Sequence, residues 1–216
     1  MQKTSTYQAF KYGIAAVALA VASMSASAAV ITYSDRASFD AQGTIVENSN
    51  FNDFGAGFDS PGTPFTRGSV TYVSAENLTV GAGTPYSIGQ SQTVMSNNYW
   101  SPLTGSIANQ FNLFGFDAAV TSGPVDITIT TNLATYLFSG LTLPNGAPDF
   151  AFEGFQATAA GEYFTGFRID TLGSSYLPGI TNVALGNAGA VPEPATAALL
   201  GLGLLGFGMA RRRRKQ

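Results

Sequence analysis

The sequence predicts an all-β domain whose strands form a sandwich or jelly roll. Of the chain's 26 aromatic residues, 22 lie within residues 29–190, together with 20 of its 25 glycines. Apolar and polar residues alternate there over short runs, as expected for half-buried strands. Clusters of Gly, Pro, Ser and Asn separate these runs, and ten or so short strands with regular turns are typical of this architecture.

The strand candidates follow one another along this whole region. In 125–130, for example, Val125, Ile127 and Ile129 share one face and polar residues the other. The full set of predicted strands is 30–33, 44–51, 69–74, 78–80, 93–95, 111–120, 125–130, 136–138, 150–155, 163–170 and 180–185. One segment, 34–42, predicts a short helix capped by Ser34 or Asp35.

The absence of two residue types excludes whole classes of chemistry. The chain has 216 residues, a length that suits one domain with appendages, and it contains no His and no Cys. Ser-His-Asp and Cys-His catalysis, disulfides, zinc sites of the usual nitrogen or sulfur type, and haem held by His or Cys are therefore excluded. We expect no cofactor, apart from the calcium discussed below.

Charge is distributed unevenly along the chain. Between Ala29 and Ala190 there are three arginines, twelve acids and no lysine, so this stretch carries a net charge of −9. Such a body cannot neutralise phosphates, and we expect no nucleic-acid partner.

The N-terminus has the features of an export signal. Lys3 and Lys11 precede an apolar run of 12 residues at 13–24, which is too short to span a bilayer. Ala26 and Ala28 then supply the small residues that signal peptidase requires. We predict a signal helix within residues 1–28, cleavage after Ala28, and a mature body that starts outside the cytoplasm.

The C-terminus predicts a single membrane-spanning helix. After a linker at 187–191, Pro192, Glu193 and Pro194 lead into 16 apolar residues at 195–210, which reach ~24 Å of a ~30 Å hydrocarbon core. The cationic residues that follow are expected to stay in the cytoplasm, with the body outside. They are Arg211, Arg212, Arg213, Arg214 and Lys215.

This ending resembles the PEP-CTERM sorting signal, in which Pro-Glu-Pro precedes a short transmembrane helix and an Arg-rich tail. The resemblance covers 192–215. It implies processing by an exosortase, an integral-membrane enzyme of Gram-negative bacteria that make exopolysaccharide and biofilm matrix. Cleavage near Pro192-Glu193-Pro194 would send the body to the cell surface or the matrix. The alternative is a plain membrane anchor that is never cut.

Three short motifs give a second resemblance. The segments 32–39, 114–117 and 181–186 resemble those of β-rich ectodomains that precede PEP-CTERM tails. This resemblance implies a galactose-binding-like or concanavalin-like jelly roll over 29–186. In the third motif Thr181 stands where the family usually has an acid, which weakens any ligand role there.

A loop-rich stretch near the N-terminus of the body predicts a hard-cation site. Oxygen ligands gather at Asn50, Asn52, Asp53 and Asp59, without the spacing of an EF-hand. Calcium is the expected ion. The alternative is that these residues serve only as turn formers.

Two further hypotheses concern glycans. Tyr99 and Trp100 could stack on sugar rings, although a lone Trp in a sandwich can equally fill the core. Paired carboxylates, Asp117 with Asp126 or Asp149 with Glu153, would allow glycoside hydrolysis. We favour a non-enzymatic surface or matrix component that binds polysaccharide. A secreted, carboxylate-dependent glycan-active enzyme is the alternative.

Overall fold

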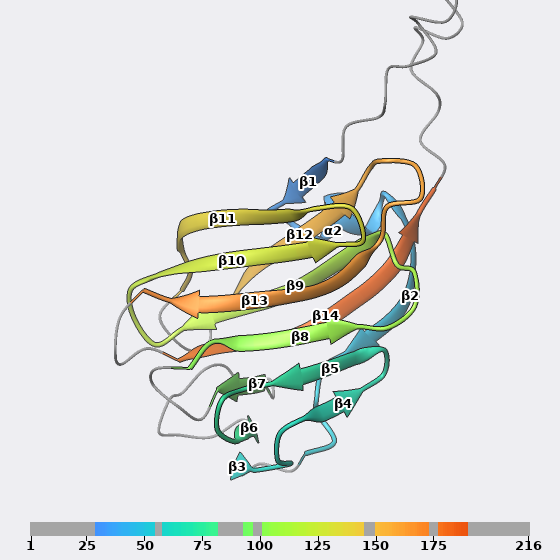
Figure 1. Cartoon of the computed structure of the whole chain (residues 1–216). Coiled ribbons are helices and arrows are strands. Elements are labelled where there is room, and N and C mark those ends of the chain that lie inside the picture. Colours follow the sequence, from blue (N-terminus) through green and yellow to red (C-terminus); the bar gives the residue numbers. More distant parts are fainter. Residues whose placement is uncertain are drawn as a thin grey trace, which may run out of the picture.

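The chain folds as a β-sandwich of two antiparallel sheets, which confirms the predicted fold class (Figure 1). The computed structural model describes residues 29–54, 58–81, 93–96, 101–144, 150–172 and 177–189. One sheet has eight strands and the other has six.

The eight-stranded sheet has the order β1-β12-β9-β14-β7-β6-β3, and β2 also pairs with β14. Its strands are β1 (Val30–Tyr33), β2 (Gly43–Ser49), β3 (Phe58–Asp59), β6 (Leu78–Gly81), β7 (Thr93–Ser96), β9 (Leu113–Val120), β12 (Ala151–Ala157) and β14 (Pro178–Ala188). The long strand β14 pairs with β9 along one side and with β2 and β7 along the other.

The six-stranded sheet has the order β11-β10-β13-β8-β5-β4 and lies in front in Figure 1. Its strands are β4 (Phe65–Arg67), β5 (Val70–Val73), β8 (Leu103–Ile107), β10 (Pro124–Thr131), β11 (Thr135–Thr142) and β13 (Phe164–Thr171). Strand β10 shows the predicted alternation, since Val125, Ile127 and Ile129 are buried and the residues between them are half-buried.

The core between the sheets is rich in aromatic rings. Phe114 of β9 lies 5.2 Å from Phe167 of β13, and Phe116 lies 5.9 Å from the same ring. Such ring pairs add to the free energy gained from burial. The two sheets are therefore joined by large apolar side chains.

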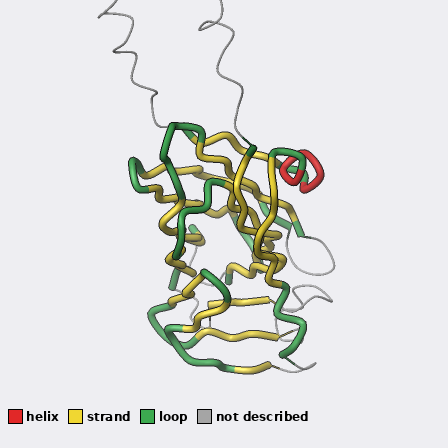
Figure 2. Tube along the Cα trace, turned by 90° about the vertical axis from the view of Figure 1, so that its right-hand side faces the viewer, coloured by secondary structure: helices red, strands yellow, loops and turns green. Residues whose placement is uncertain are grey.

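Within the described ranges there is one short helix, α2 (Arg36–Asp40), which packs on the outer face of the eight-stranded sheet (Figure 2). Asp35 caps it, because its side chain accepts a hydrogen bond from the Ser38 backbone N–H at 2.9 Å. Phe39 is fully buried against Phe152. The facing residues Gly115 and Gly154 make room for these rings, since a Cβ at Gly154 would lie 2.8 Å from Phe39.

The predicted segments largely coincide with the observed strands. The predicted strand 30–33 has the bounds of β1, and the predicted helix 34–42 contains α2 with Asp35 as its cap. Three observed strands were not predicted, namely β3, β4 and β8. The first two have two and three residues, and Thr104-Gly105-Ser106 gives β8 the composition of a turn.

Both ends of the described body lie at the same end of the sandwich. Val30, at the start of β1, pairs with Ala157 at the end of β12. The neighbouring Gln156 pairs with Leu113 at the start of β9, and Leu113 also pairs with Gly186 near the end of β14. In Figure 1 the start of β1 and the end of β14 lie at this end of the sandwich. Among the described residues no helix is long and apolar enough to span a membrane. The predicted signal helix and the predicted anchor at 195–210 lie outside these residues.

Candidate functional site

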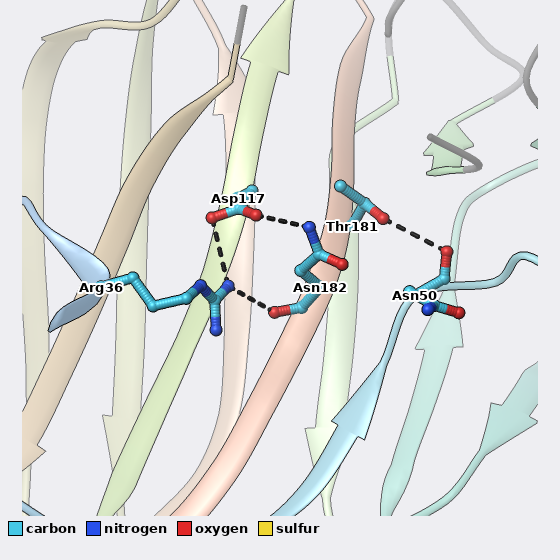
Figure 3. A network of polar contacts seen from close by, with 5 residues as sticks. All are labelled: Arg36, Asn50, Asp117, Thr181 and Asn182. Atoms are coloured by element: carbon cyan, nitrogen blue, oxygen red, sulfur yellow. Dashed lines mark hydrogen bonds and ion pairs between the residues drawn. The ribbon is translucent and has the colours of Figure 1, made fainter. Parts of the chain in front are cut away.

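A polar network on the outer face of the eight-stranded sheet joins the three sequence motifs (Figure 3). Arg36 Nη2 donates to Asp117 Oδ1 at 3.1 Å and to the carbonyl oxygen of Asn182 at 2.7 Å. Asn182 Nδ2 donates to Asp117 Oδ2 at 2.6 Å. One residue from each motif, on α2, β9 and β14, therefore meets the other two.

The backbone of β14 creates this arrangement. Its pairing with β9 shifts register between Thr181 and Ala184, and Asn182 within the shift has a φ of +47°. Asn tolerates this left-handed conformation better than most residues. Beside it, Thr181 Oγ1 donates to the carbonyl oxygen of Asn50 at 3.3 Å. The network thus fixes a bulge and ties β14 to the end of β2.

The side chains of this network bind one another, and we call Arg36, Asp117 and Asn182 the clasp. Both carboxylate oxygens of Asp117 accept a hydrogen bond, and Arg36 stacks over the Phe152 ring at 4.6 Å. The side chains of Arg36 and Asp117 are 28% and 18% exposed, so water reaches the pair only in part. The groups satisfy one another, and the arrangement contains no activated nucleophile. We therefore assign it a stabilising role.

Each arginine of the body pairs with an aspartate. Besides Arg36, Arg67 makes a two-pronged contact with Asp53, at 3.1 and 2.5 Å, and Arg168 contacts Asp170 at 2.5 Å. The sequence has no other lysine or arginine between Ala29 and Ala190. The body thus offers no cation that is free to receive an anionic ligand.

The residues predicted to bind calcium make other contacts in this structure. The Arg67 hydrogen bonds occupy Asp53 and lower the pKa of its carboxyl group. Asn50 Oδ1 accepts the Asn52 backbone N–H at 3.1 Å, and Asp59 Oδ1 accepts that of Ser60 at 2.8 Å. These are turn contacts. The described part of the chain holds no group of three or more Asp, Glu, His or Cys residues placed to bind a metal, and calcium binding at this Asn-containing site stays a prediction.

The carboxylates considered for hydrolysis are separated by the fold. Asp117 points outward from the eight-stranded sheet, whereas Asp126 lies on the six-stranded sheet and accepts hydrogen bonds from Ser139 and Gly140. Glu153 is half-buried, and burial raises the pKa of its carboxyl group. Its proposed partner Asp149 lies outside the described residues.

Sequence reasoning missed a row of hydroxyl groups on the outer face of the six-stranded sheet. The row runs across all six strands, with one residue from each strand paired in register with the next. Its members are Thr135, Thr130, Gly166, Ser106, Thr71 and Thr66, with glycine as the one gap. At ~4.8 Å per strand it is about 24 Å long. Only the strand register could reveal it.

A buried cluster of hydroxyl groups joins the two residues that flank segment 97–100, which contains the chain's one tryptophan. Ser74 Oγ lies 3.0 Å from Ser96 Oγ and donates to Ser101 Oγ at 3.2 Å. Tyr99 and Trp100, the predicted glycan-stacking residues between them, lie outside the described residues. The cluster holds together the two ends of this segment.

The predicted sorting and cleavage residues also lie outside the described residues. They are Ala26, Ala28, Pro192, Glu193, Pro194, Arg211, Arg212, Arg213, Arg214 and Lys215. A family model for the PEP-CTERM protein-sorting motif matches residues 190–214. The chain carries a PEP-CTERM protein-sorting motif. This match confirms the resemblance seen over 192–215, and it implies a surface protein that an exosortase targets.

Comparisons of the whole chain add little to the PEP-CTERM match. No curated protein matches the sequence. Among solved structures, a family 29 carbohydrate-binding module shares 11% identity, over 64% of this chain and 99% of the module, with a TM-score of 0.36. The CBM22-1 xylan-binding domain from Paenibacillus barcinonensis shares 15% identity, over 68% and 97%, with a TM-score of 0.38.

A third similar structure is the K2 cleaved adhesin domain of Lys-gingipain, at 12% identity, over 64% of this chain and 98% of that domain, with a TM-score of 0.36. The sandwich assignment rests on this chain's own strand pairing.

Proposed function

We propose that this chain is an exported protein that an exosortase cuts at its PEP-CTERM motif and delivers to the cell surface or matrix of a Gram-negative bacterium. One observation carries the proposal: the match to the sorting motif begins at residue 190, directly after strand β14 and Gly189. The sandwich is the cargo, and it acts there without catalysis.

The start of the body supports the proposed order of export steps. Ala29, the predicted first residue of the mature chain, is already part of the fold. Its carbonyl oxygen accepts hydrogen bonds from the backbone N–H and the Oγ1 of Thr158, both at 3.0 Å. Signal peptidase would remove residues 1–28, while the helix at 195–210 holds the body as a single-pass protein.

The motif residues have separate roles in this proposal. Pro192, Glu193 and Pro194 are what the exosortase recognises, so Glu193 is a recognition group rather than a catalytic acid. The basic run at 211–215 stays in the cytoplasm and holds the helix in the bilayer lipid until cleavage.

Mass spectrometry of the protein from its host tests this proposal. We expect an N-terminus near Ala29 and a C-terminus near Pro192. A mature protein that still ends in Gln216 would show a permanent anchor instead. A Glu193→Ala variant should accumulate as precursor, whereas Glu76→Ala, which removes an exposed acid of the body, should mature normally.

Within this function, the jelly-roll body binds a neutral polysaccharide. The hydroxyl row offers donors and acceptors to sugar hydroxyls along about 24 Å of the sheet. The three paired arginines disfavour an anionic polymer, because binding one would require breaking an ion pair. Tyr99 and Trp100 would add stacking.

Affinity electrophoresis of the full chain in detergent tests the ligand class. We expect a neutral β-glucan in the gel to retard migration and alginate, a polyanion, to leave it unchanged. A Thr130→Ala/Ser106→Ala variant should lose the retardation, and Asn48→Ala on the other sheet should not. Since the chain has one Trp, quenching of its fluorescence by the glucan would report stacking by Trp100.

A glycan-active enzyme remains the second candidate because of one group. The raised pKa of Glu153 is what a general acid needs. Release of reducing ends from the same neutral glucan, lost in Glu153→Gln, would favour the enzyme and refute the non-catalytic function.

A further inference from the structure

Hydrogen bonds join the loops at the end of the sandwich where β1 begins and β14 ends. Gly189 N–H donates to Gln42 O at 2.9 Å, and the Ala188 N–H donates to Asn112 Oδ1 at 2.7 Å. Asn132 N–H donates to Tyr163 O at 3.0 Å. We call this the chain-end surface, and define it as residues 29, 41–42, 68–69, 108–112, 132–134, 158–163 and 189.

The chain-end surface exposes no charged side chain, although the body has a net charge of −9. The only Asp, Glu, Lys or Arg in its segments is Glu162, which is 3% exposed. The Oε1 of Glu162 accepts hydrogen bonds from Thr131 Oγ1 and Tyr136 OH, each at 2.8 Å. Three acids flank the surface. Glu47 accepts hydrogen bonds from Ser69, Asp53 pairs with Arg67, and Asp40 is exposed at the end of α2, directly before Ala41.

The exposed residues of this surface are small, amide-bearing or apolar. Asn109, Gln110, Asn132 and Ala160 are exposed, and Leu133 is 55% exposed. Acids lie toward the other end, where Asp126 and Asp170 face each other on neighbouring strands near the β9–β10 turn. The far end of the strands therefore carries two neighbouring acids, of which Asp170 pairs with Arg168, whereas the exposed residues of the chain-end surface are uncharged.

We propose that the chain-end surface lies against the lipid headgroups of the membrane that holds the precursor, and this rests on the anchoring helix of the proposed function. Only five residues separate Gly189 from the start of that helix at Ala195, a reach of at most ~22 Å. Charges at the loop tips would then lie within a few Debye lengths of the lipid surface. An acidic end would be repelled by anionic headgroups, whereas this end exposes no acidic side chain and, after signal cleavage, carries the α-ammonium of Ala29.

Single-cysteine labelling tests the orientation, because the chain has no Cys of its own. Full-length Leu133→Cys and Ser122→Cys variants, the latter in the β9–β10 turn, carry a fluorophore in phosphatidylethanolamine–phosphatidylglycerol vesicles. Nitroxide-labelled headgroups quench only nearby labels. We expect a loss of emission at position 133 and little at position 122. Equal quenching at both sites, or none at either, overturns the proposal.

Added acids test the role of charge. With the label at position 133, Gln110→Glu/Ala160→Glu should reduce the quenching in phosphatidylglycerol vesicles but not in phosphatidylcholine vesicles. The matched control, Ser122→Glu/Leu172→Glu at the other end, should change neither. Unchanged quenching in the acidic variant overturns the charge argument.

Two further outcomes separate this inference from the proposed function. A chain that fails to float with the vesicles has no working anchor, which refutes the membrane step of the proposed function itself. Protection of position 133 in host membranes but not in pure lipid vesicles would mean that the surface faces a membrane protein, and that result overturns the lipid assignment.

Discussion

Removing the carboxylate of Asp117 should break the clasp that joins α2, β9 and β14 and lower the free energy of unfolding. Asp117→Ala deletes the acceptor of the 3.1 Å bond from Arg36 and of the 2.6 Å bond from Asn182. It leaves the guanidinium over Phe152 without its counter-ion. The side-chain hydrogen bonds that remain at the bulge in β14 are then those from Arg36 to the Asn182 carbonyl oxygen and from Thr181 to the Asn50 carbonyl oxygen.

The cost follows from the two contacts. A hydrogen bond to a charged group contributes about 1.5–3 kcal/mol. The ion pair is partly exposed, with side chains 28% and 18% accessible, so it adds only ~0.2–1 kcal/mol. The free energy of unfolding should therefore fall by about 2–3 kcal/mol. For a domain of this size that lowers Tm by about 4–12 °C.

Thermal unfolding of the full chain in detergent, followed by circular dichroism, measures this change. Glu76→Ala is the matched control, since it removes an exposed acid and should cost at most ~0.5 kcal/mol. Two variants of Asn182 separate side chain from backbone, because its φ is +47°. Asn182→Gly loses only the hydrogen bond, while Asn182→Ala also incurs about 1–2 kcal/mol of strain.

The reasoning fails if Asp117→Ala lowers Tm no more than Glu76→Ala does. It also fails if Asn182→Ala is as stable as Asn182→Gly, since the left-handed backbone would then not be required.

Three further predictions concern packing, pH and metal binding. Gly154→Ala should lower Tm by an amount equivalent to about 1–3 kcal/mol, because its Cβ would lie 2.7 Å from the Phe152 ring. Burial raises the pKa of Tyr136 to about 12, so in the folded protein the phenol stays neutral up to a higher pH than in the unfolded chain. The free energy of unfolding should therefore fall as pH rises from about 10 to 12. Urea titrations over this range should show a smaller fall for Tyr136→Phe. If calcium binds at the predicted site it must compete with Arg67 for Asp53, and it should then raise Tm; an unchanged Tm in calcium titrations would refute the predicted cation site.

The strands could be predicted where the signal is local. In β10 the alternation of Val125, Ile127 and Ile129 with polar residues reports burial on one face of one segment. Strand β8 was not predicted because Thr104, Gly105 and Ser106 have the composition of a turn. In the structure the Phe167 ring packs over Gly105. Tertiary packing, rather than local preference, makes that segment a strand.

The clasp and the hydroxyl row could not be derived from local patterns. Arg36 and Asp117 are separated by 81 positions, and Arg36 and Asn182 by 146. A resemblance singled out the three motifs, but it did not indicate that their side chains meet. Their contact depends on the register of β9 with β14, and the hydroxyl row depends on the register of six strands.

The placement of Ala29 constrains the timing of maturation. A peptidase acts on an extended and accessible chain, yet the carbonyl oxygen of Ala29 is held by Thr158, and β1 begins one residue later. With cleavage after Ala28, the scissile bond must be cut before β1 closes onto β12. Until that moment β12 is a bare sheet edge, open to pairing with another molecule. Slow removal of the leader should therefore show itself as aggregation of the newly exported precursor.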